Sequence, residues 1–175
     1  MQMRELVGEL VSRRVREYFS ESPIAVTPRP MVYPPASIGQ LEALEQRAGQ
    51  AIELDYREFL TLTDGLEGLP FSLLGCHDWE PGGLGEAAKE FTAMLVECGT
   101  PEDVGIPPGA ALLPVAVNSD RSAGILLIDT AGFADERFWL TGEGDSFFFR
   151  TFSDVLHHLR DSDVSGLRET LGREA

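Results

Sequence analysis

The spacing of apolar residues changes from a helical to a strand pattern near residue 110, and this change restricts the fold more than any other feature. Before it, apolar residues recur at steps of three and four, the period of an amphipathic helix. After it, four runs have the composition of strands: 111–117, 124–129, 137–141 and 146–151. Short loops join these runs, which predicts antiparallel pairing. We predict an α+β fold with a mostly antiparallel central sheet of about four to six strands flanked by helices.

Local signals mark where the predicted helices begin and end. A helix is predicted from Met3 to about Ser20, with its arginines on the polar side, and another over 86–98 that buries Met94 and Cys98. Capping side chains that accept free backbone N–H groups predict three further helix starts: Ser37 with Gln40, Asp55 with Glu58, and Thr151. Gly49 and Asp64-Gly65 predict the ends of two of these helices.

Two features of the strand region constrain the sheet. Pro114 lacks a backbone donor, so its strand lies at an edge or carries a bulge. Phe147, Phe148 and Phe149 cannot all point to one side, because side chains alternate along a strand. Either helices cover both faces of the sheet, or one face exposes Phe148.

The chain is predicted to be one domain with an N-terminal extension. Five prolines between residues 23 and 35 predict an extended linker or edge segment. We assign 1–36 to a helix and Pro-rich linker packed on the domain, and 37–175 to a single domain. The last residues are polar and predicted to fray, with a short helix around Leu167 and Leu171.

The charge of the chain is strongly acidic and unevenly placed. The formal net charge is −15, and the first 50 residues are balanced, so the excess lies after residue 50. This argues against nucleic acid and anionic membranes as partners, since both attract basic proteins. It fits a basic protein partner, although acidity can serve solubility alone. Without a signal peptide or an apolar span, and with only two cysteines, we expect a cytoplasmic protein.

No residue pattern predicts catalysis or metal binding. Cys76, His77 and Cys98, with His157 or His158, lack zinc spacing, and Cys98 is predicted to be a small core residue. No nucleophile is placed beside a histidine base. We therefore predict no catalytic residue, no cofactor and no metal. A hydrolase with a carboxylate pair stays open as an alternative, because acidic residues are abundant.

The order of these signals resembles one known family. The segment IGQLEALEQRAGQAIELDYREFLTLTDG, then LLPVAVNSDRSAGILLIDT, then FFFRTFSDVLHHL is similar to the SUKH (Smi/Knr-like) superfamily over about residues 37–160. The matching positions are Glu45, Tyr56, Phe59, Leu60, Gly65, Gly124, Phe152 and Leu156. The chain departs from the family where Asp64 replaces the usual Asn, and where Ile52-Glu53-Leu54-Asp55 replaces a Leu-Pro step.

The resemblance implies an α+β fold without catalytic residues. Many bacterial members are immunity proteins that bind and neutralise a toxin of the same locus, often a nuclease, whereas fungal members regulate cell-wall assembly. The resemblance therefore implies a cognate protein toxin as the partner, and a basic one if charge is complementary. A regulatory adaptor of the same superfamily is the alternative.

Two groups of loop residues are predicted to bind the partner. The first combines carboxylates with an aromatic anchor, a mixture that interfaces favour: Asp64, Glu67, His77, Asp78, Trp79 and Glu80. The second is a possible acidic rim in the strand turns: Asp120, Asp135, Glu136, Glu143 and Asp145. The alternative is that Trp79 packs on the sheet and the carboxylates are simply solvated.

Overall fold

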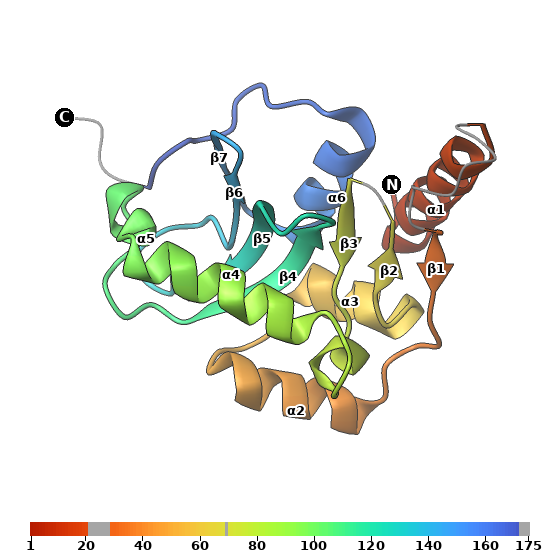
Figure 1. The fold of residues 1–175 in the computed structure, drawn as a ribbon, viewed down its shortest axis with the longest axis horizontal. Coiled ribbons are helices and arrows are strands. Elements are labelled where there is room, and N and C mark those ends of the chain that lie inside the picture. The colour runs from red at the N-terminus through yellow and green to blue at the C-terminus, as the bar shows by residue number, and fades with distance from the viewer. Residues whose placement is uncertain (21–28, 69, 172–175) are drawn as a thin grey trace.

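The computed structural model describes residues 1–20, 29–68 and 70–171 (Figure 1). In these residues one sheet has seven strands in sequence order, and every neighbouring pair is antiparallel. The strands are β1 (Met31–Val32), β2 (Leu66–Glu67), β3 (Phe71–Leu73), β4 (Leu112–Asn118), β5 (Ala123–Ile128), β6 (Phe138–Gly142) and β7 (Asp145–Phe149). The predicted α+β fold is confirmed. The sheet has more strands than expected because β1, β2 and β3 are too short to show a period.

The described residues form six α-helices and one 3-10 helix, η1. Their bounds are α1 (Met3–Ser20), α2 (Ile38–Ala48), α3 (Leu54–Leu62), η1 (Cys76–Trp79), α4 (Gly85–Glu97), α5 (Thr100–Asp103) and α6 (Phe152–Asp161). The capping box at Ser37 and the cap at Thr151 are confirmed, as is the left-handed Gly49 (φ 62°). The cap at Asp55 is wrong, because Glu53 accepts the N–H of Tyr56 at 3.0 Å and starts α3 earlier.

Helices cover both faces of the sheet. Figure 1 shows α4 in front of β4 and β5, with α3 and α6 on the other side. Along β5, Ile125 and Leu127 join the core under α1, α2, α3 and α6, whereas Leu126 and Ile128 face α4. Phe148 is 2% exposed and stacks on Trp139 in the α4 layer. The alternative that both faces are covered is therefore the correct one.

The strand that contains Pro114 lies inside the sheet. β4 pairs with β3 on one side and β5 on the other, and its register shifts between Pro114 and Ala116. Proline cannot donate to the ladder, so an interior strand accommodates it at a bulge. Of the two predicted options, the bulge is the one observed.

The N-terminal helix is part of the fold, and a buried arginine fixes it in place. α1 packs against α3 and α6. Arg14 is 3% exposed and donates to the carbonyl oxygens of Leu66 at 3.2 Å and Phe71 at 2.6 Å. The sequence pattern placed every arginine of this helix on the outer face, which is wrong for Arg14. Its charge is stabilised by carbonyls that only the β2–β3 turn supplies.

The C-terminal segment of the chain differs from the prediction. The backbone N–H of Phe148 donates to the oxygen of Arg168 at 2.9 Å, and Leu171 is buried, so the segment up to 171 covers the β7 edge. The predicted frayed tail and short helix are therefore wrong in this part. Residues 172–175 lie outside the described residues, as do Pro23 and Pro28. None of the described helices is long and apolar enough to cross a membrane.

Candidate protein-binding groove

A buried carboxylate organises the turn between β3 and η1. Asp64 Oδ1 accepts the N–H of Cys76 at 2.5 Å, and its Oδ2 accepts the N–H of His77 at 3.0 Å. Gly75 is required at the start of η1, because a Cβ there would lie 2.1 Å from the carbonyl oxygen of Asp64. The end of α3 and the start of η1 are thus held together by one side chain.

A second buried carboxylate closes the same turn. Asp78 Oδ2 accepts the N–H of Gly75 at 2.8 Å, and Oδ1 accepts that of Leu84 at 3.4 Å. Burial raises the pKa of Asp78 above its ordinary range. Asp64 and Asp78 are each 4% exposed. Their oxygens accept hydrogen bonds from backbone N–H groups inside the fold. The prediction that these two aspartates form part of an exposed binding surface is therefore wrong.

His77 and Cys76 complete this buried cluster. Nδ1 of His77 lies 3.2 Å from Asp64 Oδ2, and its ring packs 4.0 Å from the ring of Tyr33. The hydroxyl of Tyr33 donates to Glu67. Burial and the hydrogen bond to Asp64 raise the pKa of the Cys76 thiol to about 12. A thiol that stays protonated at neutral pH is a poor nucleophile.

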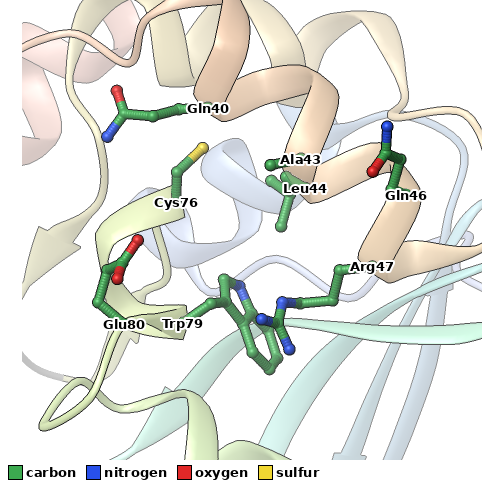
Figure 2. Close-up of a pocket in the computed structure, with 8 residues that line it drawn as sticks. All are labelled: Gln40, Ala43, Leu44, Gln46, Arg47, Cys76, Trp79 and Glu80. Atoms are coloured by element: carbon green, nitrogen blue, oxygen red, sulfur yellow. The ribbon is translucent and has the colours of Figure 1, made fainter.

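On its other side, η1 opens onto a groove that we call the Trp79 groove. It consists of two hollows of about 510 and 470 Å³, both of which Arg47 and Trp79 line. The first hollow lies between α2 and η1 and is also lined by Gln40, Ala43, Leu44, Gln46, Cys76 and Glu80 (Figure 2). The second, between α4 and β4, is also lined by Lys89, Thr92, Ala93, Val96, Glu97, Leu112, Leu113 and Pro114. Both volumes are in the range of ligand pockets.

Trp79 and Arg47 meet at the junction of the two hollows. The guanidinium carbon of Arg47 lies 5.2 Å from the centre of the Trp79 ring, a cation–π arrangement that Figure 2 shows from the side of the first hollow. Trp79 is half-buried, and its Nε1 is buried without an acceptor among the described residues. The groove therefore has an aromatic surface with an exposed guanidinium beside it, while the indole N–H itself is not accessible from the groove.

The outer face of α4 borders the groove and is partly apolar. Met94 is 50% and Val96 is 52% exposed. Cys98, which follows the helix, is exposed too. The predicted burial of Met94 and Cys98 is wrong, because the sheet contacts the face of α4 that carries Phe91 and Leu95 instead. Exposed glutamates are interspersed with these apolar side chains: Glu86, Glu90 and Glu97.

The second predicted acidic group is divided between two ends of the sheet. Ser122 Oγ lies 2.7 Å from a carboxylate oxygen of Asp120 and 2.5 Å from one of Glu143, and the exposed Asp145 lies in the same hairpin as Glu143. Asp135 and Glu136 lie in the loop at the opposite end of β5. Glu136 is 7% exposed and lies 3.5 Å from Arg168. A single rim is therefore wrong, since the two turns lie at opposite ends of one strand.

The structure brings only part of the first predicted group to the groove. Trp79 and the exposed Glu80 line it, whereas Glu67, His77 and both aspartates belong to the cluster behind η1. Sequence reasoning missed Arg47, Lys89 and Val96, which have no local signal beyond lying on helices. No group of three or more His, Cys, Asp or Glu side chains in the described part of the chain could hold a metal ion.

Comparison with known proteins adds no assignment to this geometry. The chain matches no protein-family model and no curated protein at a significant level of similarity. The resemblance to the SUKH superfamily therefore stays a prediction.

Proposed function

We propose that this protein is a non-catalytic protein-binding domain of the SUKH type, which neutralises a cognate bacterial toxin by direct binding. The observation that carries the proposal is the half-buried Trp79 in an open groove between α2, η1 and α4. Tryptophan and arginine, which meet here, are among the residue types that most often dominate the binding energy of protein interfaces.

The charge around the groove supports a partner with a basic surface. Glu80 and Glu97 line the two hollows, and Glu86 and Glu90 are exposed on α4. Such carboxylates accelerate association with a basic protein and fix its orientation. The two described carboxylates whose pKa is raised by burial, Asp78 and Glu53, accept backbone N–H groups and do not line the groove, which supports binding over acid–base catalysis.

The proposal is tested with the product of the adjacent gene. The two proteins are co-expressed and purified, and binding is measured by calorimetry at low and at physiological salt. We expect a complex that abolishes the partner's toxicity in a growth assay. Its affinity should fall as salt rises, because salt screens exposed charges.

A matched pair of variants tests whether the Trp79 groove is the contact surface. Val96 and Phe133 are both 52% exposed, but only Val96 lines the groove. Val96→Asp should weaken the complex about tenfold or more, since it places a charge against an apolar contact, while Phe133→Asp should not. Equal effects would place the interface elsewhere. Binding that leaves toxicity intact would favour a regulatory adaptor, and no binding to the neighbour's product would contradict the proposal.

A further inference from the structure

The outward face of α1 is exposed along the helix. It carries Glu5, Gly8, Ser12 and Arg16, which follow one another at steps of three and four and lie in one row. An open hollow of about 840 Å³ lies over this row, and all but one of the residues that line it belong to 1–16. Figure 1 shows α1 at the opposite end of the molecule from α5. The helix also lies outside the segment that resembles the SUKH superfamily, so the proposed function gives this face no role.

Two charged side chains of the row have no ion pair within the chain. The charged residues beside the row are paired: Arg13 with Glu17 at 2.7 Å, and Glu9 with Arg160 at 2.8 Å. Glu5 and Arg16 have no oppositely charged partner among the described residues. They are about three helical turns apart, so they cannot pair with each other. Both charges are therefore available to a partner molecule.

Gly8 occupies a position where the fold of one chain does not require glycine. It lies inside α1, and a Cβ at this position would meet no atom within 4 Å. Glycine in a helix interior lowers stability relative to alanine, because it loses more conformational freedom on folding. Its use is the close approach of another backbone, and the fold of one chain places none there. The glycine fits a second helix packed against this face.

The same face of a second copy, in the antiparallel direction, is complementary to this row. A two-fold axis through the middle of α1 places Glu5 opposite Arg16 of the second copy, with Gly8 beside the axis. At 100° per residue, Glu5 and Arg16 lie within about 20° of each other around the helix, so they meet on the same side of the axis. The axis also brings Met1 near the second copy's Phe19. Phe19 is 77% exposed and Met1 is exposed too, so the contact buries apolar surface at both ends.

We propose that α1 binds α1 of a second copy of this chain in an antiparallel contact with two-fold symmetry. Each dimer has two ion pairs between Glu5 and Arg16, whereas a parallel contact would place Glu5 against Glu5. Two 18-residue helices, each about 27 Å long, bury less than a standard interface, so the dimer is weak and depends on concentration. No residue of α1 lines the Trp79 groove, so the dimer presents two open grooves. The inference goes beyond toxin neutralisation and does not depend on it.

Sedimentation velocity on the full chain, from about 5 to 500 µM, tests for the dimer. We expect the natural chain to shift from monomer towards dimer as concentration rises. Glu5→Arg and Arg16→Glu, each alone, should weaken association about tenfold or more, since each places like charges opposite one another twice. An equimolar mixture of the two variants should associate again, because the mixed dimer has opposite charges at both contacts.

Two further variants separate the contact from effects on folding and on net charge. Arg4→Glu makes the same charge change as Arg16→Glu, but Arg4 is turned about 100° from Glu5 around the helix. It should associate as the natural chain does. Gly8→Gln should weaken the dimer while the urea midpoint stays the same or rises, because the side chain has open space in the monomer.

Several results would overturn the inference. They are a monomer at every concentration, equal losses with Arg4→Glu and Arg16→Glu, a mixture of the two charge variants that associates no better than either alone, or a dimer that Gly8→Gln leaves intact. All are measured on this chain without a toxin. Failure to bind the neighbouring gene's product would therefore remove the proposed function and leave the dimer standing, and the reverse also holds.

Discussion

The carboxylate of Asp64 accepts the backbone N–H of Cys76 at 2.5 Å, so a side chain at the end of α3 determines where η1 begins. The adjacent N–H of His77 depends on the same carboxylate. Asp64→Ala leaves both donors without an acceptor in a buried turn. We expect it to lower the free energy of unfolding by about 2–4 kcal/mol, measured by urea denaturation.

Asp64→Asn separates the capping role from the charge. An amide retains one acceptor oxygen, so this variant should lose less stability than Asp64→Ala. Asp135→Ala, at an exposed loop position, is the control and should leave the urea midpoint unchanged. Equal midpoints for Asp64→Ala and Asp135→Ala would show that the cap does not support the fold.

The buried Arg14 should contribute to stability through hydrogen bonds rather than through charge. Burial lowers its pKa to about 10, which reflects the cost of placing the cation between α1 and the β2–β3 turn. Arg14→Met keeps an unbranched apolar stem but leaves two carbonyl oxygens without this donor. We expect a loss of about 2–3 kcal/mol in thermal or urea unfolding. Arg16→Met on the exposed face of α1 is the matched control, and the two variants should differ clearly.

The two cysteines should react at different rates. Cys98 is exposed, whereas Cys76 is buried and its thiol is held protonated by burial and by Asp64. Iodoacetamide at pH 8 should modify one thiol quickly and the second only after unfolding in urea. Mass spectrometry identifies the modified residue. Fast modification of Cys76 in the folded protein would contradict the burial of this thiol.

The same thiol should make stability depend on alkaline pH. The pKa of Cys76 is about 12 in the folded protein, against about 8.5 for an unfolded chain. Between these values the unfolded chain has released a proton that the folded protein retains, so stability falls as pH rises. Cys76→Ala should reduce the loss of stability between pH 8 and pH 10, measured by urea midpoints, and Cys98→Ala should not. Identical slopes for the two variants would exclude this origin.

Features that depend on neighbouring residues could be predicted from the sequence. Ser37 and Gln40 cap α2 across one helical turn, and Gly49 ends the same helix in the left-handed conformation. The apolar run 124–129 was predicted as a strand, and it corresponds to β5 (Ala123–Ile128), in which every residue is buried. The contacts that cap a helix lie within a few residues of each other, and the apolar composition of a run indicates by itself that the strand is buried.

The tertiary structure decided the features that join distant segments. Arg14 lies on a helix face that its spacing marks as polar, and its acceptors are the carbonyls of Leu66 and Phe71, 52 and 57 residues later in the chain. The Trp79 groove likewise exists because α2, η1, α4 and β4 converge, which places Arg47 on Trp79. The local sequence determined helices, strands and the acidic charge, since these depend on period and composition. Which carboxylates are buried, and which cation meets the tryptophan, depended on packing between elements that no local pattern encodes.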